Sequence, residues 1–162
     1  MDIITEKGNL VNVLVPVSAA LNTPSDIVNV ANYHDCTFLL IKGAGAVGTG
    51  TVTVDVCDTV APANTAKCGY KYRRFDSVAG EWGVLTDRTS VQSFATTAAA
   101  NDLYEISVDT DIIGNTIVNN ARGNHYVRLC LAQVDATAVL HAIVCILGKA
   151  RYGGQNPVDP LV

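Results

Sequence analysis

Apolar and polar residues alternate along most of this chain in short runs, which is the pattern of half-buried β-strands. Segments rich in Gly, Pro, Asn, Asp and Ser separate these runs, as at 59–67 and 115–124. The expected strands cover residues 11–17, 27–30, 36–42, 51–57, 69–75, 91–94, 103–108, 125–133 and 138–147. Many short strands between turn signals predict an all-β domain, either an antiparallel sandwich or a barrel.

The last two strands are expected to be central. Residues 139–147 are almost wholly apolar, so that strand has two apolar faces. Such a strand lies either inside a sandwich or under an oligomer interface. Helix signals are few: residues 109–114 predict one turn, capped by Asp109 or Thr110 and closed by Gly114.

One segment resembles an enzyme motif. Gly43-Ala44-Gly45-Ala46-Val47-Gly48 fits the GxGxxG fingerprint of dinucleotide-binding folds, which requires a helix after the glycines. Residues 49–57 instead alternate Thr and Val with period two, which is a strand pattern. We therefore expect the glycines to form the loop of a β-hairpin. A nest of backbone amides that binds an anion is the alternative.

The composition favours contact with protein rather than with nucleic acid or membrane. Only 16% of the 162 residues are charged, against about 25% in an average soluble protein. The net charge of −4 gives no basic footprint for nucleic acid or anionic lipid. The N-terminus lacks the basic start of a signal peptide, and no apolar run is long enough to cross a bilayer. We expect synthesis in the host cytoplasm, with neither a nucleic-acid nor a membrane partner.

Catalytic and metal-binding patterns are weak. The five cysteines are odd in number and form no C-x-x-C, so we expect buried reduced thiols, with a Cys57–Cys68 bridge as the alternative. His34 and Cys36 should share one face of a strand, but no second pair with ligand spacing accompanies them. No nucleophile–base pair is visible. The sequence predicts no enzyme, no metal and no cofactor.

One cluster combines basic and aromatic residues, Lys71-Tyr72-Arg73-Arg74-Phe75. On a strand, Tyr72 and Arg74 should face one way, and Arg73 and Phe75 the other. Such a cluster can stack on bases, but Tyr and Arg are also enriched at protein interfaces. Because the chain is acidic, contact with another protein is the favoured interpretation.

Several segments in order resemble a known family. Tyr70-Lys71-Tyr72-Arg73-Arg74 precedes Trp82-Gly83-Val84-Leu85-Thr86, and then come residues 101–109, Tyr126-Val127-Arg128-Leu129 and a closing stretch at 146–152. This order, over residues 27–152, resembles the capsid decoration (cement) proteins of tailed bacteriophages. The resemblance implies a jelly-roll-like β-sandwich that oligomerises as a dimer or trimer and binds the major capsid protein on the virion surface.

We therefore expect three regions: an N-terminal arm and first strand at 1–26, a β-sandwich at 27–152 and an extended tail at 153–162. The function expected is that of a structural virion protein that stabilises the capsid lattice across subunit joins. The alternative is a carbohydrate-binding or receptor-facing module of the virion. The candidate interface residues are Tyr72, Arg73, Arg74, Phe75, Trp82, Arg151, Tyr152, Pro157, Pro160 and Leu161.

Overall fold

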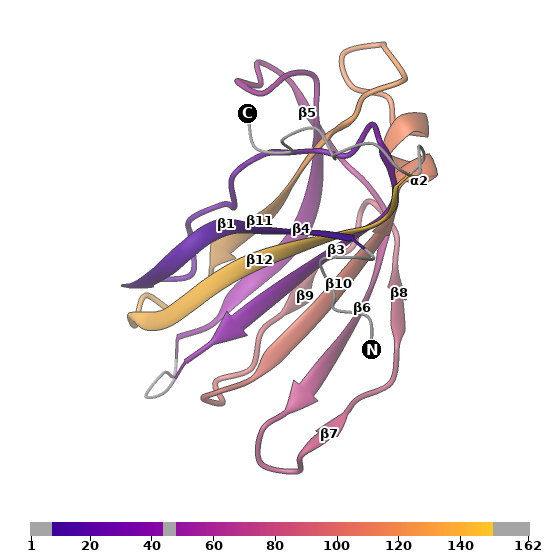
Figure 1. Cartoon of the computed structure of the whole chain (residues 1–162). Coiled ribbons are helices and arrows are strands. Elements are labelled where there is room, and N and C mark those ends of the chain that lie inside the picture. The colour runs from indigo at the N-terminus through magenta and orange to yellow at the C-terminus, as the bar shows by residue number, and fades with distance from the viewer. Residues whose placement is uncertain (1–7, 44–47, 151–162) are drawn as a thin grey trace.

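Two antiparallel β-sheets pack face to face and one short helix closes one end, which confirms the predicted β-sandwich (Figure 1). The computed structural model describes residues 8–43 and 48–150. The large sheet contains β1 (Gly8–Ala19), β3 (Tyr33–Lys42), β6 (Tyr70–Asp76), β7 (Glu81–Trp82), β8 (Thr86–Arg88), β10 (Leu103–Asp109) and β12 (Val139–Ala150). The small sheet contains β2 (Val28–Asn29), β4 (Gly50–Cys57), β5 (Thr65–Lys67), β9 (Phe94–Ala95) and β11 (Tyr126–Gln133). The helix is α2 (Thr110–Asn115).

The strand order is that of a jelly roll. The large sheet runs β1-β12-β3-β10-β6-β7, with β8 also paired to β6, and the small sheet runs β2-β11-β4-β5, with β9 paired to β4. From β1 to β4, and again from β10 to β12, each strand lies in the sheet opposite to the one before it. This alternation defines the eight-stranded jelly roll, to which β6, β7 and β8 add an extension beyond β10.

Each of the nine predicted strands corresponds to an observed strand. The weakest match is 91–94, of which only Phe94 is in a strand. The sequence missed β5, β7 and β8, which have two or three residues each and are too short to show a period; β5 lies inside the predicted loop 59–67. Helix α2 is capped by the Asp109 carboxylate, as predicted, but it ends one residue beyond Gly114.

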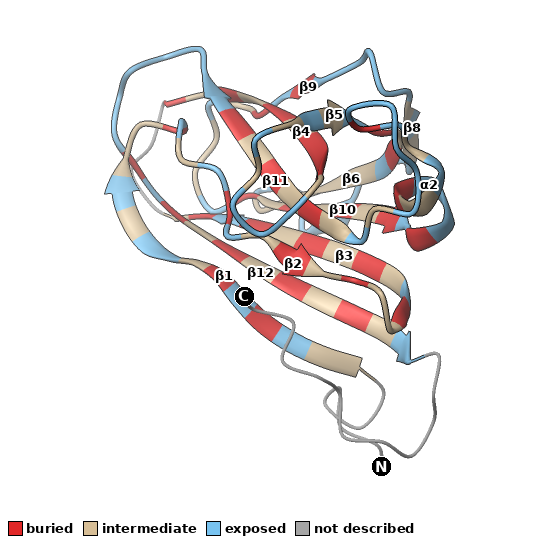
Figure 2. Ribbon diagram, turned by 90° about the horizontal axis from the view of Figure 1, so that it is seen from above, coloured by how far each residue is buried: buried red, intermediate tan, exposed pale blue. Residues whose placement is uncertain are grey.

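The core lies between the two sheets, and it is built from the inward face of every long strand. Along β3 and β12, buried residues alternate with half-buried or exposed ones (Figure 2). An aromatic group fills the space near β9, where the Tyr72 ring stacks on Phe94 with the centroids 3.9 Å apart. Tyr104 lies on the same Phe94 ring, with its centroid at 5.6 Å.

The predicted hairpin at the glycine-rich segment is wrong. Strand β3 pairs with β10 and β12, whereas β4 pairs with β5, β9 and β11, so the two strands lie in different sheets. Two alternating runs around a short loop look the same in sequence whether the strands pair or the chain crosses between sheets. Residues 44–47 lie outside the described residues, and the anion-nest interpretation falls mostly on them.

The described glycines of this crossing are needed for close packing. A Cβ on Gly48 would collide with the Thr137 carbonyl oxygen, and one on Gly50 would lie 2.9 Å from the Leu21 Cβ. Gly43 donates its N–H to the Leu140 carbonyl oxygen at 2.6 Å. These glycines therefore let the crossing lie against the loops of its own chain.

We predict that Gly48→Ala lowers the free energy of unfolding by about 1–3 kcal/mol, because backbone must shift to admit the methyl group. Gly114→Ala is the control: nothing lies within 4 Å of its added Cβ, and alanine in a helix is expected to stabilise by about 0.5–1 kcal/mol. Urea unfolding midpoints measure both. Equal midpoints for the two variants would contradict the packing role of Gly48.

Candidate protein-interaction surface

The large sheet has a second apolar face, directed away from the core, which we call the outer face. Along β12 the inward residues are buried, whereas every second residue between them faces outward and is half-buried or exposed. The same alternation occurs in β3 and β10. The apolar side chains on the outer face are Leu10, Leu39, Ile41, Phe75, Trp82, Leu103, Leu140, Ala142, Val144 and Ile146.

Strand register aligns five of these side chains across five strands. Ala142 lies opposite Ile41, and Ile41 lies opposite Leu103. Leu103 lies opposite Phe75, which in turn lies opposite Trp82. Directly opposite residues on one face of a sheet are in contact distance, so these five form a continuous stripe, which we call the apolar row.

The outer face is open in the described part of the chain. No described helix or strand lies in front of it in Figure 1, and the large sheet borders that side of the molecule in Figure 2. Ile41, Leu140 and Trp82 are each between 41% and 46% exposed. By contrast, the outward positions of the small sheet carry Thr53, Asp55 and other polar side chains. Within residues 8–43 and 48–150, it is therefore the large sheet that has an apolar outward face without a cover.

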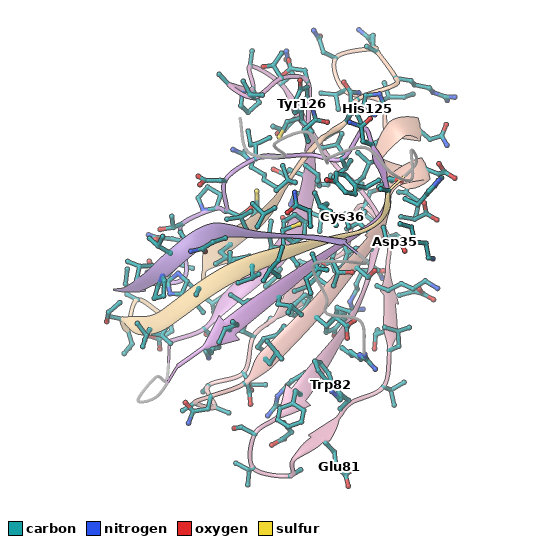
Figure 3. All side chains as sticks on the ribbon, in the orientation of Figure 1. Asp35, Cys36, Glu81, Trp82, His125 and Tyr126 are labelled. Carbon is teal, nitrogen blue, oxygen red and sulfur yellow. The ribbon has the colours of Figure 1, made fainter. Side chains whose placement is uncertain are left out.

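Trp82 ends the apolar row at the tip formed by β6 and β7 (Figure 3). The Arg73 guanidinium lies over its ring, 4.5 Å from the centroid, and the Phe75 ring meets it edge-on at 5.4 Å. Cation–π and edge-to-face contacts of this kind hold an exposed indole in one orientation. Trp82 is thus an ordered aromatic side chain at the margin of the outer face.

The charged side chains of this face are paired with one another. Arg73 forms an ion pair with Glu105 on the neighbouring strand. At the end near α2, Lys149 lies 2.9 Å from Asp35. Lys71 lies 3.4 Å from Asp87. Each of these positive groups has a negative partner, and Asp109, which lies opposite Asp35, adds one carboxylate that accepts a hydrogen bond from the Asp111 N–H.

The structure separates the five described interface candidates into two groups. Arg73, Phe75 and Trp82 lie on the outer face, whereas Tyr72 and Arg74 point toward the core side, as the alternation predicted. The remaining five candidates, Arg151, Tyr152, Pro157, Pro160 and Leu161, lie outside the described residues. Sequence reasoning missed the contribution of β3 and β10 to this face, although Leu39 and Ile41 alternate with the inward residues Phe38 and Leu40 of β3.

Behind the apolar row, the core side holds a buried ionic cluster of Asp102, Arg74 and Lys42. Asp102 is fully buried; its carboxylate lies 2.7 Å from the Arg74 Nε and accepts a hydrogen bond from the Thr97 hydroxyl. The Lys42 ammonium donates to the carbonyl oxygens of Gly48 and Thr97. Burial lowers the pKa of Lys42. The cluster joins β3, β6 and the segment before β10.

A hollow of about 330 Å³ lies between β6, β8 and α2. Its walls include Tyr70, Val108 and Ile112, together with the ion-paired Lys71 and Asp87. No histidine or cysteine lines it; Ser107 does, and its hydroxyl accepts a hydrogen bond from the Thr37 hydroxyl. Its lining gives no basis for assigning a catalytic role.

The predicted face-sharing of His34 and Cys36 is wrong. His34 is exposed and Cys36 is fully buried, because the alternation of β3 is interrupted: both Tyr33 and Cys36 point inward. His141 and Cys145 do share the buried face of β12, and the His141 Nδ1 lies 2.9 Å from the Val139 carbonyl oxygen. Among the described residues, no group of three or more potential ligands could hold a metal ion.

All five cysteines are free thiols, and four are buried, so Cys57 and Cys68 form no bridge. Burial raises the pKa of the Cys57 thiol to about 11 and that of Cys68 to about 12. Burial also raises the pKa of Cys130 to about 12, and the neighbouring Asp55 carboxylate adds to this. A nucleophilic cysteine needs a lowered pKa, so these three thiols behave as small apolar side chains.

Comparison with known proteins yields a structural similarity. The chain matches no known protein-family model and no curated protein. A solved structure, that of the SPBc2 prophage-derived protein YomS, is similar with a TM-score of 0.43 and 8% sequence identity, over 87% of this chain and 93% of that chain. In the part of the chain that the structure describes, no helix has the length and apolar character needed to span a membrane.

We predict that Asp102→Asn lowers the free energy of unfolding by about 3–5 kcal/mol, because Arg74 and Lys42 lose their buried counter-charge. Asp87→Asn is the matched control: it breaks an exposed ion pair and should cost less than about 1 kcal/mol. Chemical denaturation at neutral pH measures both. A loss for Asp102→Asn as small as that of the control would contradict the stabilising role of the cluster.

The thiols predict a fall in stability at alkaline pH. Unfolding returns the thiols of Cys57 and Cys68 to the ordinary pKa of 9.0. Their contribution to the free energy of unfolding is therefore complete below pH 9 and is lost as the pH rises toward 11–12. Each thiol adds a slope that approaches about 1.4 kcal/mol per pH unit. Stability curves from pH 8 to pH 10.5 should therefore fall less steeply for Cys68→Ala. Parallel curves for the unaltered chain and Cys68→Ala would show that Cys68 does not cause the loss of stability.

Proposed function

We propose that this chain is a structural protein of a phage virion that binds the outer surface of the capsid and stabilises the lattice across subunit joins. The observation that carries the proposal is the apolar row, which crosses five strands of an open face and indicates a protein that acts by packing against other protein chains. A soluble monomer rarely exposes a continuous apolar patch of this extent, and such patches mark protein contacts. The resemblance of residues 27–152 to phage capsid decoration proteins supports a phage capsid as the partner.

The proposed function is not enzymatic, because the thiols and basic groups described above are buried or paired with carboxylates. The buried thiols have raised pKa values, and the hollow beside α2 is lined by ion pairs without histidine or cysteine. The basic cluster on β6 is neutralised: Arg73 pairs with Glu105, and Arg74 pairs with Asp102 and Asp76. Paired arginines are poor phosphate ligands, which also supports a protein partner over nucleic acid.

Binding would stabilise a capsid by mass action. A protein that binds the assembled shell but not its separated subunits adds its binding free energy to the stability of the shell. Many identical copies add avidity where one copy contacts two subunits. The contacts with the shell are assigned first to the terminal arms, because the glycines and prolines of 153–162 disfavour a helix or a central strand.

We predict that the purified chain sediments with capsids and not with the separated capsid protein. The test mixes the full chain with empty and with mature capsids, pellets the particles and measures the protein in the pellet. The control is bovine serum albumin in the same mixtures. Failure to sediment with either kind of capsid would refute the proposal.

Truncation before Gly153 tests the assigned arm. The shortened chain should keep its thermal unfolding midpoint, because the described sandwich ends at Ala150, but it should pellet less with capsids. A matched control replaces residues 153–162 with a Gly/Ser sequence of equal length. If the shortened chain pellets as fully as the intact one, the arm is not the contact.

A further inference from the structure

We infer that the outer face is covered by the same face of a second copy, so that the protein is a two-fold dimer with the large sheets packed against each other. The inference rests on the proposed function only in that both describe a protein that acts by packing against other chains. It names the chain that covers the outer face, because the capsid contacts proposed for the arms leave this face uncovered.

Charge is the first argument for a second copy. In a two-fold interface the same patch lies on both copies, so a patch with a large charge of one sign would meet a patch with the same charge. The outer face avoids this conflict, because Arg73 is paired with Glu105, Lys149 with Asp35, and Lys71 with Asp87. A face directed at a partner of opposite charge would carry unpaired groups of one sign. With a single carboxylate, Asp109, in excess of the three pairs, this face suits a copy of itself.

Side-chain size along the apolar row is the second argument. The row runs from Ala142, its smallest member, to Trp82, its largest. A two-fold axis through Leu103, in the interface and parallel to the strands, would place Trp82 of one copy over Ala142 of the other. The space above a small side chain can then accept the large ring, as in sheets that pack in layers.

The area of the face is the third argument. Six strands about 4.8 Å apart and a ten-residue strand of about 33 Å define a face of roughly 800 Å². A stable interface of standard size buries about 800 Å² on each partner. The outer face alone is therefore large enough for a stable dimer, without a contribution from the arms.

Solubility is the fourth argument. An open apolar face is an aggregation hazard from the moment the chain folds. A second copy is available as soon as the protein is made, whereas a capsid lattice exists only after assembly. A two-fold contact also closes on itself, since each copy uses the same face, and it leaves no open end from which a filament could grow.

Sedimentation velocity of the full chain from about 1 to about 100 µM tests the inference in the absence of capsid. We expect a species of twice the 17.1 kDa chain mass. Ile41→Lys and Leu103→Lys each place a like charge in both halves of the interface, and each should raise the dimer dissociation constant at least tenfold. Ile117→Lys is the control, because Ile117 is 53% exposed but lies in the segment after α2.

Trp82 gives a second readout that needs no variant. It is the sole tryptophan of the chain and lies at the end of the apolar row. Acrylamide should quench its fluorescence weakly at concentrations where the dimer forms and strongly after dilution. A monomer at 100 µM, a dimer that Ile41→Lys leaves intact, or a dimer in which Trp82 quenching does not change on dilution would each overturn the inference.

Capsid pelleting of the same variants separates this inference from the proposed function. A monomeric Ile41→Lys chain that still pellets supports both statements. If the unaltered chain is monomeric and Ile41→Lys abolishes pelleting, the outer face binds the capsid and the dimer is refuted, while the proposed function stands. If the chain is a dimer that never pellets, the proposed function is refuted and the dimer stands.

Discussion

A single sandwich core can bury only one face of each sheet, and β12 is apolar on both, as is β3 at its Leu39–Ile41 end. The inward residues of β12, from Val139 to Leu147, fill the core, and the outward residues between them lie on the surface. This constraint explains why the large sheet has an apolar outer face. It also accounts for a chain with only 16% charged residues.

The buried ionic cluster and the apolar row are two sides of the same strands. Lys42 follows Ile41, Asp102 precedes Leu103, and Arg74 precedes Phe75, so each ionic residue adjoins a member of the row. Neighbouring residues of a strand point to opposite faces. The ion pairs on the core side therefore fix β3, β6 and the start of β10 at the point where the row crosses them. A cluster of this kind contributes to register, because a shift of one residue would bring its charges onto the outer face.

The strands and the fold class were predictable because period-two alternation is a local signal. Alternation also placed Arg73 and Phe75 opposite to Tyr72 and Arg74, as the structure has them. Pairing was not predictable, because the partner of a strand depends on residues far along the chain. For that reason the segment 43–48 looked like a hairpin loop, although it joins the two sheets. The apolar row was hidden for the same reason: its five members come from five separate parts of the sequence, and only register aligns them.

The two outer faces of the sandwich differ in a way that orients the molecule. The small sheet directs Thr51, Thr53 and Lys67 outward, and Arg128 lies 3.7 Å from Asp55 on the same face. Such a face is stable in water, whereas the outer face of the large sheet gains free energy by leaving water, at roughly 25 cal/mol for each Å² of apolar surface covered. Under the proposed arrangement the large sheets are buried against each other, and the polar small sheets are directed outward. Contact with a capsid would then fall to the small sheets, to the ends of the sandwich and to the terminal arms, because these are the parts that neither the core nor the dimer occupies.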